Sequence, residues 1–320
     1  MVNNLIFLDK LYEHFINYIN KNIEEVYHYT SLEVMSKILA NSSLRFTNIN
    51  YMNDECEFTY FYLLLEDFIN NNKSKYSKNF CKKLEKIYAE HCASPFYFVG
   101  PTIQHDNNRQ YYISSFSLSD DNLALWTLYT KEQSFMGCNF GIKPNQVSIY
   151  TNDNPLIYGK VLYDREEQEN ILNEIITTLF YVFETNTNFP EDIKTMFGRY
   201  ALFFKHPAFK QEQEYRFIYY PIDKFNIQNA ENKPFIDLPF NTRNDISSVR
   251  LSPTMRKNTD LQNIKKLFKQ NKMSTKVFNV SDIPFCNSYN TLNYDTYNVF
   301  ANADIVQEPF ILQDSNNSLL

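Results

Sequence analysis

The chain has 320 residues, of which 43% are hydrophobic and 17% aromatic, and its formal net charge is −6. This composition can bury a packed core. An acidic chain is not expected to coat nucleic acid without specificity, because that usually takes a basic surface. No apolar run approaches the roughly 20 residues that a membrane-spanning helix needs, so we expect no membrane partner.

The cysteine and glycine content narrows the function classes further. Five scattered cysteines with no Cys-x-x-Cys pair favour a reducing compartment, and charges inside the first apolar stretch argue against a signal peptide. We therefore expect a cytoplasmic protein. The five glycines form neither a Gly-x-Gly-x-x-Gly motif nor a P-loop, so a bound nucleotide would need another kind of site.

Hydrophobic spacing predicts helices and short strands in alternation. Ser31 is predicted to cap the second helix, and Asp120 or Asp121 the fifth. The helices are expected over 5–21, 32–41, 56–70, 77–92, 121–129, 165–206 with a break near 186–190, and 258–271. The strands are expected over 26–30, 44–47, 111–118, 136–142, 157–163, 213–220, 248–251 and 276–280.

These elements predict an α+β fold: a small, twisted, mixed sheet flanked by helices, with a C-terminal βαβ unit. The two strands of that unit, within 248–280, should be parallel because a helix connects them. We divide the chain into an N-terminal helix over 1–23, a main α+β domain over 24–285 and a C-terminal tail over 286–320.

Two polar segments near the N-terminus are candidate site residues. His28 lies on a strand that runs directly into a capped helix, so its ring could donate to a ligand hydroxyl or carbonyl; the alternative is a core histidine with a satisfied ring. Asp54 and Glu57 belong to an acidic loop that offers carboxylates to a hard cation. A helix cap by Asp54 is the simpler account, so no metal site is assigned.

The strand around Ser117 and the helix that follows it form a third candidate. Trp126 and Tyr129 are three residues apart and share one helix face. Trp126 is the only tryptophan of the chain. Its ring could stack on a base or a nicotinamide, and the alternative is ordinary core packing.

The fourth candidate is the segment Glu212 to Phe217. On a strand, Glu212, Glu214 and Arg216 would point to the same face, because side chains alternate. Two carboxylates beside a guanidinium can shift each other's pKa, and we expect Arg216 to keep Glu214 ionised. The alternative is an exposed edge strand with ion pairs.

The sequence resembles the bacterial family known as domain of unknown function 2971. The pattern of that family has a His-Tyr-Thr-Ser strand, an Asn-Asp-x-x-Glu loop, a Phe-Ser strand followed by Trp-x-x-Tyr, a Glu-x-Glu-aromatic-Arg strand and a closing βαβ unit. All five occur here in order, at Val26–Ser31, Asn53–Glu57, Phe116–Tyr129, Glu212–Arg216 and within 248–280. One departure is Leu251-Ser252-Pro253, where the family commonly has Gly-Pro. The resemblance covers residues 24–285 and implies no function.

A remoter resemblance is to the ADP-ribosyltransferase-like superfamily. In that superfamily a first-strand His or Arg holds the nicotinamide ribose, a Ser-x-Ser strand supports the pocket, and the last Glu of a Glu-x-Glu motif stabilises an oxocarbenium-like centre. His28, Ser115-Phe116-Ser117 and Glu212-Gln213-Glu214 occur here in that order. The resemblance implies NAD as the cofactor, with catalytic residues His28, Glu212 and Glu214. It implies further binding residues, namely Tyr29, Thr30, Ser117, Trp126, Tyr129 and Arg216.

Three functions follow as hypotheses. The first is an ADP-ribosyltransferase-like enzyme or a related enzyme that processes NAD or another nucleotide. Its role would be that of a bacterial toxin or an anti-phage defence effector. It would act on a protein or nucleic-acid acceptor and have a neutralising or regulatory partner. The second is a non-enzymatic module that binds a ligand or nucleic acid. The third is a metal-dependent nuclease. For the first, we expect His28, Trp126 or Tyr129, and Glu214 to line one cleft.

Overall fold

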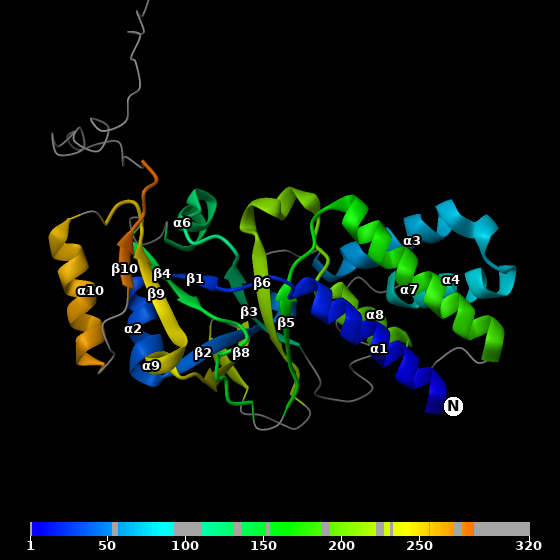
Figure 1. Ribbon diagram of the computed structural model, residues 1–320, viewed down its shortest axis with the longest axis horizontal. Coiled ribbons are helices and arrows are strands. Elements are labelled where there is room, and N and C mark those ends of the chain that lie inside the picture. Colours follow the sequence, from blue (N-terminus) through cyan, green and yellow to red (C-terminus); the bar gives the residue numbers. More distant parts are fainter. Residues whose placement is uncertain are drawn as a thin grey trace, which may run out of the picture. The chain divides into compact units, whose positions relative to one another are not determined.

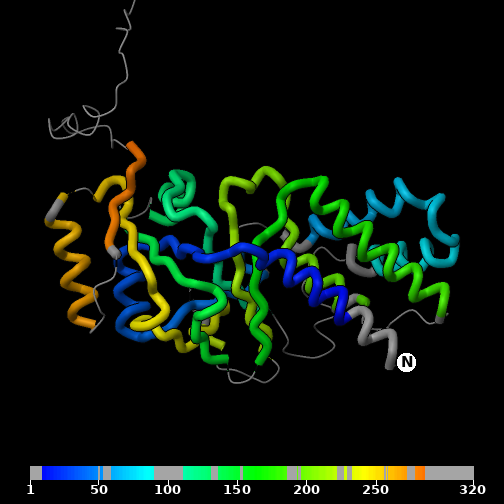
Figure 2. Tube along the Cα trace, in the orientation of Figure 1, coloured from blue at the N-terminus to red at the C-terminus, as the bar shows by residue number. Residues whose placement is uncertain are grey.

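The computed structural model describes most of residues 2–284, and Figure 1 and Figure 2 show the path of the chain. The described ranges are 2–52, 57–92, 111–130, 136–151, 154–186, 193–221, 227–230, 233–255, 257–271 and 277–284. The chain from Met1 to Pro284 forms one compact unit, so the N-terminal helix belongs to the main body. None of the helices among the described residues has both the length and the apolar character that crossing a bilayer requires.

Within the described residues, ten strands form one mixed, twisted sheet. Eight of them follow the order β10-β9-β4-β1-β3-β2-β8-β7, and β5 joins through β6, which pairs with β3. Among the strands that the structure describes, β9 and β10 are the one pair that runs parallel, as the predicted βαβ unit requires. The bounds are β1 (Val26–Ser31), β2 (Ser43–Asn48), β3 (Tyr112–Ser117), β4 (Gly137–Ile142), β5 (Leu156–Lys160), β6 (Glu214–Tyr219), β7 (Gln228–Ala230), β8 (Lys233–Pro239), β9 (Ile246–Leu251) and β10 (Val277–Val280).

The sheet forks at β3. One edge of β3 pairs with β6 over its whole length, from Tyr112 to Ser117. The other edge pairs with β1 only at Ser117, and with β2 only at Tyr112 and Ile113. Between those two points, β1 and β2 separate, and among the described strands none pairs with this edge of β3 over 114–116. The fork therefore leaves a short open edge in the middle of the sheet.

Most helices cover the sheet in two groups, each over its own core, and α6 packs over a third, smaller cluster. Phe15, Phe61 and Phe197 belong to a core on the side of α1, α3, α4, α7 and α8, which Figure 1 shows beside β5 and β6. Met35 and Ile264 belong to the second core, under α2 and α10. The bounds are α1 (Val2–Ile19), α2 (Leu32–Asn41), α3 (Glu57–Asn72), α4 (Lys78–Cys92), α6 (Leu123–Thr130), α7 (Arg165–Asn186), α8 (Ile193–Ala201), α9 (Thr242–Asp245) and α10 (Asn258–Gln270), with 3₁₀ turns η1 (Ile49–Tyr51), η2 (Lys73–Lys75) and η4 (Pro207–Glu212).

The predicted fold class is confirmed, and most elements lie where the sequence pattern predicts them. Ser31 caps α2 by accepting from the Val34 amide. Three details differ. Asn122, and neither aspartate before it, caps α6 by accepting from the Ala124 amide. The helix expected to run to 206 ends at Ala201, and the hairpin of β7 and β8 was not predicted.

Candidate functional site

Two cavities meet at the fork of the sheet. The larger, with a volume of about 440 Å³, is lined by His28, by residues of α2, β2 and β8, and by the open edge of β3. The smaller, of about 20 Å³, is lined by Glu212 and Glu214 among others. Ser115 and Tyr129 line both cavities, so they form the boundary between them.

Glu214 is the first residue of β6, and its carboxylate is almost completely enclosed, with 4% of the residue exposed. The Ser115 hydroxyl donates to its Oε1 over 2.6 Å. Its Oε2 accepts from Arg216 over 2.7 Å and from the Lys205 ammonium over 3.2 Å. Both carboxylate oxygens are thus held by donors from β3, β6 and the segment after α8.

Glu212 does not lie on the strand, so its predicted position is wrong. Gln213 has a φ of 45°, in the left-handed region, where η4 ends and before β6 begins. This turn breaks the strand alternation that the sequence pattern assumes. The two carboxylates meet in another way: the Lys205 Nζ donates to Glu212 over 2.6 Å as well as to Glu214.

Burial and ion pairing act against each other in this cluster. Burial raises the pKa of the Glu214 carboxyl above its ordinary value, whereas Lys205 and the Ser115 hydroxyl oppose the rise. Burial would lower the pKa of Lys205, but the carboxylates of Glu214 and Glu212 outweigh it and raise that pKa. Arg216 is fully buried, and its Nη1 donates to the Leu202 carbonyl over 2.6 Å. Two cations thus face two carboxylates, but burial still leaves the pKa of Glu214 raised, so the expectation that Arg216 would prevail is wrong.

His28 binds the open edge of β3. Its Nδ1 lies 2.9 Å from the Ser115 carbonyl oxygen, and its ring packs on Phe116 and Phe140 at centroid distances of 5.0 and 5.3 Å. Burial lowers the pKa of His28 to about 4. The imidazole is therefore neutral near pH 7, and the proton on Nδ1 that binds the carbonyl leaves Nε2 as an acceptor.

The His28 ring and the Glu214 carboxylate lie on opposite faces of the sheet. Tyr27 pairs with Ser117, and Ser117 pairs with Glu214, so these three residues share one face and His28 points to the other. The expected single cleft is thus two adjoining cavities, with His28 in one and Glu214 in the other. Ser115 connects them, because its carbonyl meets His28 and its hydroxyl binds Glu214.

Trp126 lines neither cavity. Only 1% of the residue is exposed, its ring packs edge-on against Tyr29 at 4.6 Å, and its Nε1 donates to Asp121 over 2.8 Å. The ring has no free face for a base or nicotinamide, so the stacking prediction is wrong for Trp126. Tyr129 is 42% exposed, and it alone of the pair lines the cavities.

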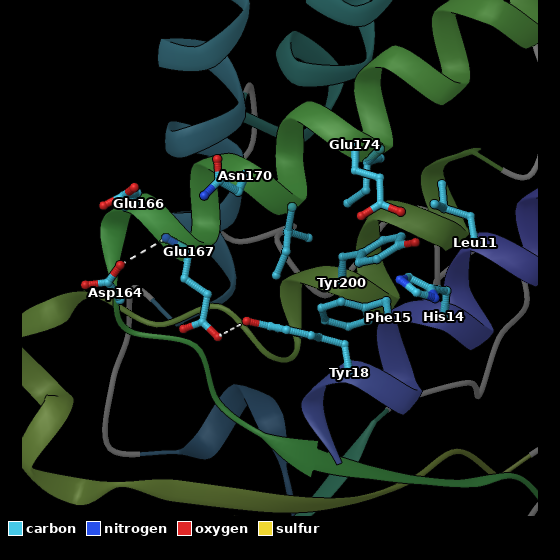
Figure 3. Close-up of a pocket in the computed structure, with 12 residues that line it drawn as sticks. Leu11, His14, Phe15, Tyr18, Asp164, Glu166, Glu167, Asn170, Glu174 and Tyr200 are labelled. Atoms are coloured by element: carbon cyan, nitrogen blue, oxygen red, sulfur yellow. Dashed lines mark hydrogen bonds between the residues drawn. The ribbon is translucent and has the colours of Figure 1, made fainter. Parts of the chain in front are cut away.

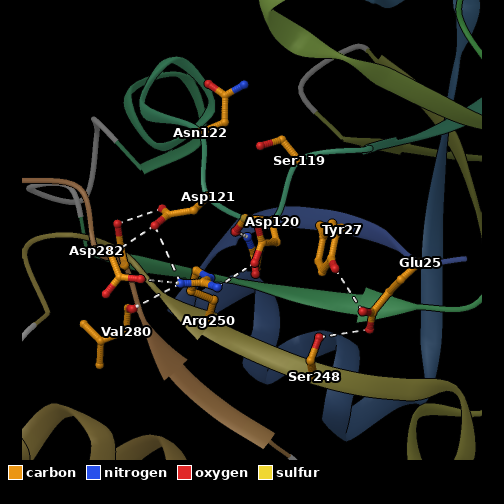
Figure 4. A network of polar contacts seen from close by, with 12 residues as sticks. Glu25, Tyr27, Ser119, Asp120, Asp121, Asn122, Ser248, Arg250, Val280 and Asp282 are labelled. Carbon is orange, nitrogen blue, oxygen red and sulfur yellow. Dashed lines mark hydrogen bonds and ion pairs between the residues drawn. The ribbon is translucent and has the colours of Figure 1, made fainter.

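A polar network anchors the start of α6. Figure 4 shows Arg250 of β9 between Asp120 and Asp121, with its Nη2 2.5 Å from the Asp120 Oδ2 and its Nη1 3.6 Å from the Asp121 Oδ2. The Tyr29 hydroxyl donates to the Ser119 carbonyl over 2.9 Å and accepts from the Asn122 amide. The two aspartates therefore attach the loop to β9, which explains why they do not cap the helix.

The remaining predicted residues have supporting positions. The Ser117 hydroxyl donates to the Glu212 carbonyl over 2.8 Å, so it fixes the turn before β6. Thr30 is buried and lines neither of the two cavities. Asp54 and the side chain of Glu57 lie outside the described residues. Within the described part of the chain, no cluster of three His, Cys, Asp or Glu side chains is placed to hold a metal ion.

Lys205 was not predicted as a site residue, and Ser115 was named only as part of the Ser-x-Ser strand that the resemblance implies, although both bind Glu214. The sequence pattern does indicate Ser115: it lies two residues before Ser117 on the same strand, so both side chains point to the same face of the sheet. Lys205 lies nine residues before Glu214, on a segment whose path only the fold defines. No spacing rule identifies a lysine that precedes two glutamates in the sequence as their buried ion-pair partner.

Comparison with known proteins supports the family resemblance over part of the chain. A family model described as protein of unknown function (DUF2971) matches residues 125–217. The matched part includes Tyr129, Lys205, Glu212, Glu214 and Arg216, but neither His28 nor the β3 strand. No curated protein and no solved structure matches the chain.

Proposed function

We propose that this chain is an ADP-ribosyltransferase-like enzyme that processes NAD or a related nucleotide, with Glu214 as the catalytic carboxylate. One observation carries the proposal: the hydrogen bond between Ser115 and Glu214, which joins the Ser-x-Ser strand to the last Glu of the Glu-x-Glu segment. The resemblance to that superfamily implies that these two motifs meet at the reacting ribose.

The chemistry needs a fixed negative charge. The bond between the ribose C1′ and nicotinamide breaks, and its electron pair leaves with neutral nicotinamide. A nucleophile, either water or a group on an acceptor, then forms the new bond at C1′ and loses its proton to solvent. Positive charge develops on the ribose during this step, and a buried, preorganised carboxylate stabilises it.

The two cavities suit different parts of such a substrate. The larger has the size of small-molecule sites, which commonly span about 300–1,000 Å³. We propose that the unprotonated Nε2 of His28 accepts a hydrogen bond from a ribose hydroxyl there. The reacting carbon would reach Glu214 past Tyr129, whose exposed side chain borders both cavities and would have to rotate aside.

A direct test is to incubate the purified chain with NAD and to measure free nicotinamide by chromatography. The proposal predicts release that saturates with NAD concentration and that continues after EDTA is added, because none of the proposed steps uses a metal ion. Absence of release with NAD and with other nicotinamide dinucleotides would refute it.

A second function, a non-enzymatic module that binds a nucleotide or nucleic acid, has its own supporting observation. Glu214 is 4% exposed and contacts two cations, as expected of a structural ion pair. That function predicts saturable nucleotide binding without nicotinamide release. The nuclease hypothesis has less support, since Lys205 already contacts both carboxylates that would hold a metal.

The biological role is proposed from the resemblance alone. A cytoplasmic enzyme that consumes NAD or modifies a cellular target would act as a toxin or an anti-phage defence effector, restrained by a neutralising partner. Induced expression in bacteria without such a partner should then stop growth. Normal growth with abundant folded protein would argue against this role.

A further inference from the structure

A cavity of about 640 Å³ lies between α1 and α7, apart from the fork of the sheet. Residues of α1, the N-terminal half of α7 and Tyr200 of α8 line it, and it shares no lining residue with the two cavities at the fork. Its size falls within the range of small-molecule sites. The proposed enzymatic function makes no use of it.

The wall of this cavity is apolar. Phe15 and Tyr200 pack against each other at a centroid distance of 4.7 Å, and both are buried. Leu11, Ile171 and Ile175 extend the apolar surface along the two helices. A ligand that fills this space would therefore have a hydrocarbon or aromatic body.

Four carboxylates surround the apolar wall, and most have an internal explanation. Asp164 caps α7 by accepting from the Glu167 amide, and Glu167 accepts from the Tyr18 hydroxyl and from Lys160. Together with Glu166, they lie at the start of α7, where the helix dipole stabilises negative charge. Glu174 lies more than two turns further on, beyond that effect; it is exposed at the rim and makes no hydrogen bond or ion pair within the described residues.

Tyr200 supplies an independent sign of a missing partner. The residue is fully buried, and its hydroxyl has no hydrogen-bond partner within the described part of the chain. A buried hydroxyl without a partner costs about 1–3 kcal/mol, so such groups are uncommon in folded proteins. Figure 3 shows this hydroxyl on the side of the cavity where Glu174 is drawn. Burial, then the neighbouring Tyr12 and then the Glu174 carboxylate raise the pKa of Tyr200.

We propose that this cavity binds a small primary amine with an apolar body. Its ammonium group donates to the Glu174 carboxylate and the Tyr200 hydroxyl oxygen, and its hydrocarbon part packs on Leu11, Phe15 and Ile175. An ammonium has three donors and no acceptor, so it can bind both oxygens at once. A carboxylate ligand would meet like charge at this rim, and a neutral ligand would gain no ion pair with Glu174.

The test compares three probes that share an indole body: tryptamine, neutral 3-ethylindole and anionic indole-3-propionate. Calorimetric titration of the full chain should show one saturable site for tryptamine, affinity lower by about tenfold or more for 3-ethylindole, and no binding of indole-3-propionate. Equal affinity for all three probes, or no saturable binding of tryptamine, would overturn the proposal. The titration contains no NAD, so its outcome is independent of the proposed enzymatic activity.

Two variants locate the site. Glu174→Gln should lower tryptamine affinity about tenfold, whereas Glu13→Gln, at an exposed position of α1 outside the cavity lining, should leave it unchanged. Tyr200→Phe should weaken tryptamine binding severalfold and yet raise the melting temperature of the free protein, because it removes the hydroxyl that lacks a partner. Unchanged affinity in Glu174→Gln, or a fall in melting temperature in Tyr200→Phe, would contradict the assignment.

Discussion

The Ser115 hydroxyl and the Glu214 carboxylate are joined by a 2.6 Å hydrogen bond between adjacent strands of the sheet. The register explains the contact: Ser115 lies opposite Arg216, and Glu214 is two residues away on the same face. The same serine presents its carbonyl to His28 at the open edge of the fork. Ser115 is therefore the residue through which the two cavities are connected.

Removal of the Ser115 hydroxyl should weaken the fold measurably. Ser115→Ala takes a hydrogen bond from a buried charged group, so we expect the free energy of unfolding to fall by about 1.5–3 kcal/mol in urea denaturation. Ser114→Ala is the matched control. The hydroxyl of Ser114 is buried without a hydrogen-bond partner among the described residues, and its removal should be neutral or slightly stabilising. Equal losses in both variants would show that the Glu214 contact is not the cause.

Lys205 should matter because two carboxylates share its ammonium. Lys205→Met leaves Glu214 and Glu212 without it, and losing one partner of a buried pair typically costs about 3–5 kcal/mol. The loss should depend on pH. Without Lys205 the folded-state pKa of Glu214, already raised by burial, rises further, so stability should fall as pH increases above about 4.5 and recover toward acid.

Thermal unfolding of Lys205→Met from pH 4 to 8 checks this prediction. Lys210→Met removes a lysine at an exposed position of η4, and should change stability by no more than about 0.5 kcal/mol at any pH. A loss for Lys205→Met that does not vary with pH would indicate that lost packing, and not charge, is responsible.

His28 should make the wild-type protein less stable in mild acid. Burial lowers its folded-state pKa from 6.5 to about 4, so the unfolded chain takes up the proton first as pH falls. Stability is therefore lost between pH 6.5 and 4, by up to about 3 kcal/mol. His28→Phe retains an aromatic ring but does not titrate, so its free energy of unfolding should fall less over this window. Identical pH slopes in the two proteins would refute the assignment.

The sequence pattern predicted the elements that local rules govern. Ser31 caps α2, as predicted, because a serine hydroxyl directly before a helix can accept a hydrogen bond from an amide of the first turn. The parallel pairing of β9 and β10 follows from the helix that connects them. Alternation failed at Gln213, because a left-handed residue there delays the start of β6 to Glu214 and leaves Glu212 outside the strand, and no local signal marks it.

The site was harder to predict, because tertiary contacts decide which residues meet. Trp126 has the size and spacing of a stacking residue, but Tyr29 and Asp121 enclose it. His28 and Glu214 were expected in one cleft, and the fork that separates their faces depends on how β1 and β2 diverge from β3. The sequence pattern indicates which segments form strands, but not where two neighbouring strands diverge.

We propose that Glu214 stabilises the reacting ribose, and one substitution separates this role from a structural one. Glu214→Gln retains the shape of the side chain and removes its charge, and nicotinamide release and melting temperature are measured on the same preparation. Loss of an interaction made only in the transition state lowers the rate about 100-fold or more, so we predict that loss in protein that is still folded at the assay temperature. Preserved nicotinamide release together with a lower melting temperature would contradict the account and leave Glu214 as a structural ion-pair residue.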